Sequence, residues 1–465
     1  MRYIDLFSGA GGLSLGIKKA GGELLYSNEM DVYASETQKH NLKMLKEDEN
    51  KVITASIEEL HREIIGKKIK LEYQSDIVHE HQSMINSYKQ NSTLSKKHIE
   101  LVKKTKNVDL LVGGPPCQGF SNVGRGKRKS KNEEQKDFVD DPRNQLFKYF
   151  LDFVDYHNPK FVLIENVKGI MSAKGYLELI CSSLENTGNK YKVEYYLQNS
   201  YYFGVPQNRE RVFVVGIRQD LKDSDSLKFY FRSILSSFDK QRFTLKNAID
   251  DLPIIRSNPK SNNVKIESEI PIGDENSWGE DISTNNYENL ITKNLPYVDL
   301  VNSFKGKVIK PKKLYNHKCR YNNELDLEVY KLMKPGKYLG HEDNFDAVQI
   351  IPYGTKKVNG VMEYQSSFLD KYFKLNPEKP SKTITAHLIR DNNGFIHYGE
   401  IPRGISIREA ARIQSFPDWY QFKGPFTNQF KQIGNAVPPL LAEAFGKIFY
   451  TFLNDGFDAV MELNQ

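Results

Sequence analysis

The chain opens with a short apolar strand that runs directly into a glycine-rich turn. Tyr3–Phe7 is mostly apolar, residues 8–16 contain four glycines, and a helical pattern begins at Leu13. A strand-to-helix turn of this kind lets the backbone approach a nucleotide and offers it the free N–H groups of a helix start. Glycine also serves any tight turn, and Ser14 stands where the dinucleotide pattern G-x-G-x-x-G has its third glycine. The feature therefore favours an α/β fold with a nucleotide at the end of the first strand.

Three further apolar runs are typical of buried strands, and each leads to a residue with useful chemistry. The runs 24–29, 108–112 and 161–164 lead to Glu29, Cys117 and Glu165. Ligands bind beyond the carboxyl ends of the strands in an open α/β sheet, so these side chains and the glycine turn are expected along one edge. A lone acid at such a position is equally a solvated loop residue, and a free cysteine is more often a buried apolar one. Their occurrence at successive strand ends favours a site.

A polar segment, Gln207-Asn208-Arg209-Glu210-Arg211, precedes another apolar run. In an extended chain, alternation places Gln207, Arg209 and Arg211 on the same side. Arginine offers a planar fork of donors that suits an anion or a base carbonyl. The alternative is a solvated, charged strand edge.

These motifs, in this order, resemble the C5-cytosine DNA methyltransferase family. The resemblance spans nearly the whole chain and is carried by residues 5–12, 114–121, 141–144, 165–167, 207–211, 408–418 and 432–439. It implies an α/β fold: a Rossmann-like S-adenosylmethionine-dependent methyltransferase domain, with a mostly parallel twisted sheet and helices on both faces. A smaller, mostly β and irregular target-recognition domain is implied beside it.

The resemblance also implies a catalytic set for methylation at C5 of cytosine. Cys117 would bond to C6 and so activate C5, which is covalent catalysis. Glu165 would hold N3 and the exocyclic amine and supply a proton. Arg209 would bind the base carbonyl, and Arg211 would support the site. The target base must first be rotated out of the DNA duplex.

The methyl donor implied by the resemblance is S-adenosylmethionine, and no metal is implied. Its methionine end would meet the glycine turn and residues 435–437, its ribose Glu29, and its adenine Met30 and Ile57. The complete predicted cofactor set is Phe7, Ser8, Gly9, Ala10, Gly11, Gly12, Leu13, Glu29, Met30, Ile57, Gly114, Pro116, Leu146, Asn435, Ala436 and Val437. The family has an acid just before the Ile57 position, whereas this chain has Ser56.

A glycine- and lysine-rich stretch, residues 124–131, follows the cysteine motif closely. In the family such a loop closes over the flipped base; a solvated basic loop is the alternative. The residues predicted to contact the target base or DNA are Gln118, Ser121, Arg125, Lys127, Arg128 and Gln207. The chain has 66 Lys and Arg against 59 Asp and Glu, a net charge of +7. That balance is only mildly basic, so it suits nucleic acid if the charge is concentrated locally.

Changes in composition and hydrophobic pattern divide the chain into three parts. Residues 1–230 alternate strands and helices and form most of the catalytic domain, with a charged, helical insert at 58–107. Residues 231–424 form the target-recognition domain, organised by a helix within Arg408–Asp418 that ends near Pro417. Residues 425–465 return to complete the catalytic domain.

The expected setting is the bacterial cytoplasm. No apolar run approaches the ~20 residues of a membrane span. Three cysteines over 465 residues indicate a reducing environment. We expect a monomer that acts on double-stranded DNA, with a restriction endonuclease as functional partner. Two alternatives share the motifs: a tRNA cytosine-C5 methyltransferase and a catalytically inactive DNA-binding regulator. The long recognition segment favours DNA over tRNA, and the intact cysteine, glutamate and arginine favour an enzyme.

Overall fold

The structure is a computed structural model in which two compact units can be distinguished. It describes residues 1–66, 92–116, 146–173, 175–238, 241–257, 269–270, 295–311, 314–350, 355–358, 361–364, 371–388 and 392–463. The larger unit comprises Met1–Phe203, Arg209–Lys240 and Ala436–Gln465, and the smaller unit comprises Gly204–Asn208 and Gln241–Asn435.

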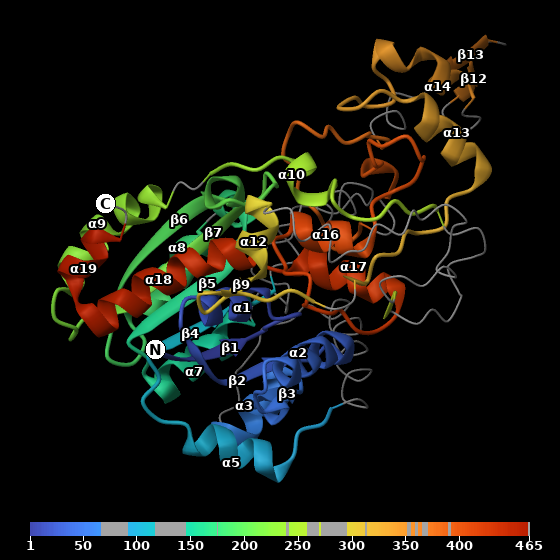
Figure 1. The fold of residues 1–465 in the computed structure, drawn as a ribbon. Coiled ribbons are helices and arrows are strands. Elements are labelled where there is room, and N and C mark those ends of the chain that lie inside the picture. The colour runs from blue at the N-terminus through green and yellow to red at the C-terminus, as the bar shows by residue number, and fades with distance from the viewer. Residues whose placement is uncertain are drawn as a thin grey trace. The chain divides into compact units, whose positions relative to one another are not determined.

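A seven-stranded sheet forms the centre of the larger unit (Figure 1). Its strands are β1 (Arg2–Leu6), β2 (Glu23–Glu29), β3 (Val52–Thr54), β4 (Leu110–Gly113), β5 (Phe161–Val167), β6 (Tyr191–Asn199) and β7 (Glu210–Arg218), in the spatial order β3-β2-β1-β4-β5-β7-β6. Strands β1 to β5 pair in parallel, whereas β7 pairs antiparallel with both β5 and β6. The predicted mostly parallel sheet is therefore confirmed.

Both faces of this sheet are buried, which explains the uninterrupted apolar runs in the sequence. Along β5, Val162 and Ile164 enter one hydrophobic cluster, and Phe161 and Leu163 enter the other. Successive strand side chains point to opposite faces, so a strand covered on both sides needs apolar residues at every position.

Helices cover the two faces, as predicted. One cluster includes side chains of α3 (Ile57–Ile64), α5 (Lys96–Lys104), α7 (Phe147–His157) and α8 (Tyr176–Glu185). The other includes side chains of α1 (Gly12–Lys19), α2 (Val32–Met44), α9 (Ser224–Ser237), α18 (Pro439–Asp455) and α19 (Phe457–Glu462). In the described part of the chain, no helix is long and apolar enough to cross a membrane.

The C-terminal helix α18 packs closely against α1. A methyl group built on Gly16 would lie 2.4 Å from both the Ala442 Cβ and the Pro439 carbonyl oxygen. The two helix backbones can approach this closely because Gly16 lacks a side chain. The segment at the end of the chain thereby belongs to the same unit as the N-terminal glycine turn.

The smaller unit combines irregular segments with short helices. Its helices are α10 (Leu245–Ile249), α12 (Pro296–Asn302), α13 (Glu324–Leu332), α14 (Phe345–Gln349), α16 (Ile407–Ile413) and α17 (Phe426–Asn435). In the part of this unit that the structure describes, the strands form two-stranded pairs: β8 (Glu269–Ile270) with β11 (Leu314–Tyr315), β9 (Ser303–Phe304) with β10 (Lys307–Val308), and β12 (Thr355–Val358) with β13 (Val361–Tyr364). A mostly β and irregular domain was expected; among the described residues the irregular segments are present, and helix outweighs strand.

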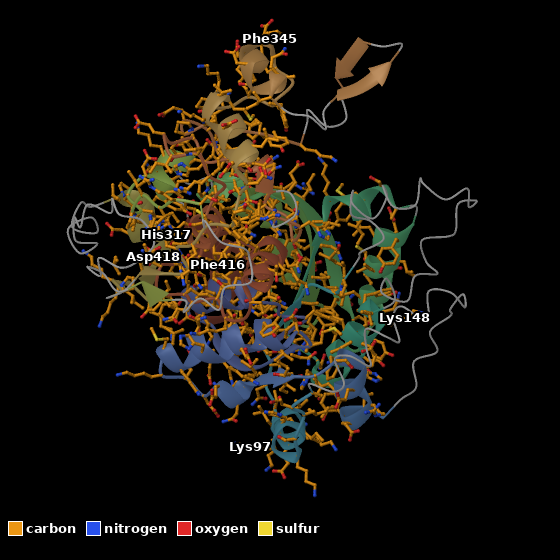
Figure 2. All side chains as sticks on the ribbon, turned by 90° about the vertical axis from the view of Figure 1, so that its right-hand side faces the viewer. Lys97, Lys148, His317, Phe345, Phe416 and Asp418 are labelled. Atoms are coloured by element: carbon orange, nitrogen blue, oxygen red, sulfur yellow. The ribbon has the colours of Figure 1, made fainter. Side chains whose placement is uncertain are left out.

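A buried ionic network organises the smaller unit around α16. The helix starts with a capping box between Ser406 and Glu409, and Arg403 donates to Glu409 at 2.7 and 2.6 Å. Arg412 donates to Asp418 at 2.7 and 2.9 Å, and neither of these two side chains is exposed (Asp418 is labelled in Figure 2). These contacts tie the helix to its own connecting segments.

Two predicted limits differ from the structure. Helix α16 ends at Ile413, before the predicted end near Pro417, because Gln414 and the left-handed Ser415 turn the chain. Helix α9 runs to Ser237 and buries Phe231 in the second cluster, so the predicted division after residue 230 falls inside one helix. The sequence patterns thus predict the presence of these helices more accurately than the residues at which they end.

Candidate active site

The carboxyl ends of the parallel strands bring the predicted residues to one edge of the sheet. Strands β1, β2, β4 and β5 lead there to the glycine turn, Glu29, Gly114 and Glu165. Strand β7 runs antiparallel to β5, so the first residues of β7 lie at this edge. Arg211, near the start of β7, pairs with Val167 at the end of β5. The topology therefore gathers the predicted side chains although the chain segments are far apart in sequence.

The glycine turn adopts backbone angles that explain its composition. Gly9 and Gly11 have φ of 54° and 79°, in the left-handed region that glycine enters without steric cost. Gly11 is the N-cap of α1 and makes no side-chain cap, so the first N–H groups of the helix are left to other partners. Helix starts of this kind attract negatively polarised groups.

Glu29 shapes this turn as well as standing beside it. Its Oε2 accepts the Gly9 N–H at 2.8 Å, and its Oε1 accepts the Asp31 N–H at 2.7 Å. Asp31 in turn caps helix α2. Two charge-assisted bonds from the backbone orient the carboxylate, and carboxylate oxygens are acceptors suited to the hydroxyl protons of a ribose. The residues present thus fit the sugar of a nucleoside cofactor.

The remaining cofactor positions of the larger unit lie near the same strand ends. Met30 is partly exposed, and Ile57 is buried at the first turn of α3. Ser56, which replaces the family's acid, is the N-cap of α3 and accepts the Glu59 N–H at 3.1 Å. Leu146 is buried at the start of α7. Ser56 thus serves in this chain to cap the start of helix α3.

Glu165 and Arg211 form an ion pair at the end of β5. The Arg211 Nε lies 3.0 Å from the Glu165 Oε1, and the two side chains are only 13% and 12% exposed. Arg211 pairs with Val167, two residues beyond Glu165, so both side chains project from the same face of the sheet. Burial raises the pKa of Glu165 above its ordinary value, while Arg211 and Arg209 oppose this rise.

Gly114 lies directly against this carboxylate. A methyl group built on Gly114 would sit 3.1 Å from the Glu165 Oε2, which is tighter than most real contacts. Asn166, the next residue on β5, donates from its amide to the Pro115 carbonyl at 3.2 Å. The turn that leads to Cys117 is therefore fixed against the strand that carries Glu165. Sequence analysis grouped Asn166 with its motif but assigned it no task.

Arg209 is almost fully buried, with 1% of its surface exposed. Its backbone N–H donates to Asn199 at 3.2 Å, and its carbonyl accepts the Ser200 N–H at 2.9 Å. Together with Arg211 it places two cations beside the one carboxylate of Glu165. The local excess of positive charge suits a reaction in which negative charge develops.

Gln207 is held by hydrogen bonds within the smaller unit. Strand β7 begins at Glu210, and Gln207 belongs to the smaller unit, where it is fully buried. Its Nε2 donates to the Ile413 carbonyl and to Gln414 at 3.3 and 2.5 Å, and its Oε1 accepts the Ile384 N–H at 2.9 Å. These internal bonds already engage the amide for which a DNA contact was predicted.

The predicted segment 435–437 is divided between the units. Asn435 is exposed at the end of α17 in the smaller unit, whereas Ala436 and Val437 are buried in the larger unit. Val437 joins the same hydrophobic cluster as Leu13 of α1. Cys117, Gln118, Ser121, Arg125, Lys127 and Arg128 lie outside the described residues.

Gln38 is a site residue that sequence analysis missed. From helix α2 its Nε2 donates to the Ser8 hydroxyl at 2.7 Å and to the Gly9 carbonyl at 2.6 Å. Its Oε1 accepts from Ser27 at 3.0 Å. The amide therefore holds the glycine turn against β2. A glutamine inside a polar helix carries no local signal for such a task.

The fold and this edge define a Rossmann-like domain of the kind that binds a nucleoside cofactor at the carboxyl ends of its strands. A family profile described as C-5 cytosine-specific DNA methylase matches residues 1–71 and 65–450. The chain therefore belongs to the C-5 cytosine-specific DNA methylase family, and it is a DNA cytosine-5-methyltransferase.

Individual relatives agree with this assignment. The type II methyltransferase M.AgeI of Thalassovita gelatinovora is 30% identical, over 96% of this chain and 98% of its own length. The type II methyltransferase M.DdeI of Desulfomicrobium norvegicum is also 30% identical, over 96% of this chain and 88% of its own. A solved structure of a candidate DNA modification methyltransferase from an E. coli prophage has the same fold, with a TM-score of 0.58, 24% identity, and coverage of 98% and 100%.

Proposed function

We propose that this enzyme transfers a methyl group from S-adenosylmethionine to C5 of a cytosine flipped out of duplex DNA, through a covalent bond between Cys117 and C6. The observation that carries the proposal is the buried pair of Glu165 and Arg211, 3.0 Å apart, with Gly114 against the carboxylate. Gly114 precedes Cys117 by three residues in the chain, so its contact with Glu165 brings the cysteine segment close to the carboxylate.

The chemistry divides into steps in which protein side chains have distinct tasks. The Cys117 thiolate adds to C6, and electrons move through the ring toward N3, where Glu165 delivers a proton. Carbon C5 then takes the methyl group that the sulfonium cofactor supplies. Loss of the C5 proton, expulsion of the thiolate and return of the N3 proton to Glu165 restore the aromatic ring and free the enzyme. Each step is easier than direct attack by C5 on the methyl group.

The electrostatics of the site support the task given to Glu165. A carboxyl whose pKa is raised by burial holds a proton closer to neutral pH and is a better general acid there. Arg209 and Arg211 limit this rise and stabilise negative charge that develops on the base and its carbonyl. Arg209 would bind the base carbonyl, and Arg211 would orient Glu165.

The other two cysteines are poor nucleophiles, which favours Cys117. Burial raises the pKa of the Cys181 thiol to about 11, and burial raises that of Cys319 to about 12. Since the thiolate is the reactive form, neither residue is reactive at neutral pH. Cys181 lies on α8, and Cys319 lies in the smaller unit, where it contacts Arg403.

The cofactor set of the larger unit supports S-adenosylmethionine. The glycine turn, the oriented carboxylate of Glu29 and the apolar side chain of Ile57 would hold the methionine end, the ribose and the adenine. The bound cofactor supplies the electrophilic methyl group. We further propose that the larger unit is the catalytic domain, that the smaller unit reads the target sequence, and that a restriction endonuclease is the functional partner.

Covalent trapping tests the mechanism. A duplex with 5-fluorocytosine at the target position cannot lose its C5 substituent, so wild-type enzyme with cofactor should form a stable adduct on a denaturing gel. Unmethylated plasmid, treated with enzyme and then mapped by bisulfite sequencing, supplies the target position. Cys117→Ala should form no adduct and transfer no methyl group while still binding the cofactor.

The matched control is Cys181→Ala, which removes a thiol far from the proposed chemistry and should leave transfer and trapping unchanged. A parallel reaction with tRNA distinguishes the two nucleic-acid substrates, and methyl transfer to tRNA in place of duplex DNA would contradict the proposed substrate. Adduct formation by Cys117→Ala would exclude the proposed nucleophile.

A further inference from the structure

A buried carboxyl lies directly before the glycine turn, and the proposed chemistry gives it no task. Asp5 is the fourth residue of β1 and has none of its surface exposed. In the sheet it lies beside Ser27 of β2 and Val112 of β4. Successive side chains of a strand point to opposite faces, so Asp5 shares the face of Tyr3, which packs with side chains of α1. Asp5 therefore lies on the side of the sheet that is covered by the helix of the glycine turn.

The protein does little to stabilise a charge on this carboxyl. Among the described residues, no hydrogen bond of ordinary length and direction reaches either carboxyl oxygen of Asp5. Burial is the largest influence and raises the pKa of Asp5 well above its ordinary value. The hydroxyl and N–H of Ser14, in the first turn of α1, partly oppose this rise, and the charge of Glu29 adds to it. A buried carboxyl without a full set of partners favours its neutral, protonated form.

The lysines of α1, of its neighbour α18 and of α2 already have partners. The pairs are Lys18 with Glu47, Lys19 and Lys447 with Glu443, Lys39 with Thr54, and Lys43 with Glu49. Within the sheet, the charge that acts on Asp5 is that of a second acid, Glu29, at the end of β2. A cation that binds at the glycine turn would therefore meet two acids, and one of them has no ion-pair partner among the described residues.

The proposed methyl donor is a cation of this kind. S-adenosylmethionine carries a sulfonium and an ammonium group against a single carboxylate, whereas S-adenosylhomocysteine has lost the sulfonium charge and is neutral overall. A positive charge nearby favours the ionised form of a carboxyl. Donor and product would thus act differently on Asp5, although they differ by only one methyl group.

We propose that Asp5 is the counter-charge of the methyl donor: it holds a proton in the free enzyme, releases that proton to solvent when S-adenosylmethionine binds, and takes one up from solvent when S-adenosylhomocysteine remains. Because Asp5 is fully buried, it acts through its charge. The charge favours the donor over the product and so assists release of the product. The inference rests on the proposed function, since it takes S-adenosylmethionine as the donor.

Calorimetry in two buffers of different ionisation enthalpy counts the protons exchanged on binding. The measurements cover about pH 5 to pH 7, where the amino groups of both ligands stay protonated. Wild-type enzyme should release, at the maximum, about 0.5 proton or more with S-adenosylmethionine and less than about 0.2 with S-adenosylhomocysteine. Binding that releases a proton strengthens as the pH rises, so the Kd of the donor should fall over this range while that of the product stays flat.

Two variants make the result specific. Asp5→Asn keeps the size of the side chain but cannot ionise, so it should bind the donor without this release. Its preference for S-adenosylmethionine over S-adenosylhomocysteine should fall about tenfold, the effect of one nearby unit charge in a partly buried site. Glu165→Gln is the matched control, because it removes another buried carboxyl whose pKa is raised, and it should retain the release. Thermal unfolding shows that each variant is folded, and the wild-type comparison of donor with product needs no variant.

Equal proton release with the two ligands, or release that persists in Asp5→Asn, would overturn the inference. Wild-type enzyme that binds S-adenosylmethionine without exchanging protons would also overturn it, and would leave the proposed function intact. Wild-type enzyme that binds no S-adenosylmethionine would contradict the proposed function itself and the inference with it.

Discussion

Replacing Arg211 with methionine should destabilise the protein in a manner that depends strongly on pH. The substitution keeps an unbranched side chain but removes the charge that lies 3.0 Å from the Glu165 Oε1. Two unit charges about 4 Å apart attract by about 4 kcal/mol at an effective dielectric constant of 20. Removal of one partner of a buried pair costs about 3–5 kcal/mol. Because both side chains retain slight exposure, we expect a loss of about 2–3 kcal/mol at pH 8.

The dependence on pH follows from the carboxyl that is left behind. Burial already raises the pKa of Glu165, and loss of Arg211 removes the main opposing influence. A group whose folded pKa lies above its unfolded value binds more protons in the folded state, so the stability it contributes falls as pH rises. Protonating a carboxyl costs about 1.4 kcal/mol for each pH unit above its unfolded pKa of about 4.3. The loss should therefore shrink to about 1 kcal/mol at pH 5.

Urea unfolding at pH 5 and pH 8 of four proteins measures this effect: wild type, Arg211→Met, Glu165→Gln and the double variant. The double variant removes both charges of the pair and leaves only the buried Arg209 nearby, so it should recover part of the stability that Arg211→Met loses at pH 8. An Arg211→Met loss that is the same at both pH values, or a double variant as unstable as Arg211→Met, would refute the reasoning.

Three further predictions concern other parts of the chain. Glu29→Gln should weaken S-adenosylmethionine binding about 10- to 100-fold, since a hydrogen bond to a charged acceptor contributes about 1.5–3 kcal/mol. Calorimetry measures this affinity, and an unchanged value would exclude a contact between Glu29 and the ribose. Gly16→Ala should lower the free energy of unfolding, measured in urea, by about 1–3 kcal/mol or more, because the added methyl group would lie 2.4 Å from α18. Its control, Glu36→Ala on the exposed side of α2, should have little effect. Asp418→Asn should cost about 1.5–3 kcal/mol, because Arg412 loses one of its two buried carboxylate partners and keeps the other, Asp251. Burial opposes ionisation of Asp418, but Arg412 lowers the pKa of this carboxyl to about 2. In the wild-type protein the stabilisation by this ion pair should therefore be lost as the pH falls from about 4 to about 2. A wild-type free energy of unfolding that is flat over this range would contradict the pairing.

The sequence by itself determined the elements and the chemistry of the parallel half of the sheet. Uninterrupted apolar runs predict strands covered on both faces, and the strands β1, β2, β4 and β5 formed at those runs. Because parallel strands all end at one edge, the glycine turn, Glu29 and Glu165 could be placed together without knowledge of any contact. These are local patterns combined with one topological rule.

Only the tertiary structure decided how distant segments meet. The antiparallel register of β7 against β5 brings Arg211 onto the same face as Glu165, whereas Gln207 lies before this strand and is held by hydrogen bonds within the smaller unit. The hydrogen bonds of Gln38 and the contact of Gly16 with α18 each depend on pairs of residues far apart in the chain. Hydrophobic periodicity reports which side of an element is buried, but strand register and helix contacts follow from packing of the whole unit, which no local pattern records.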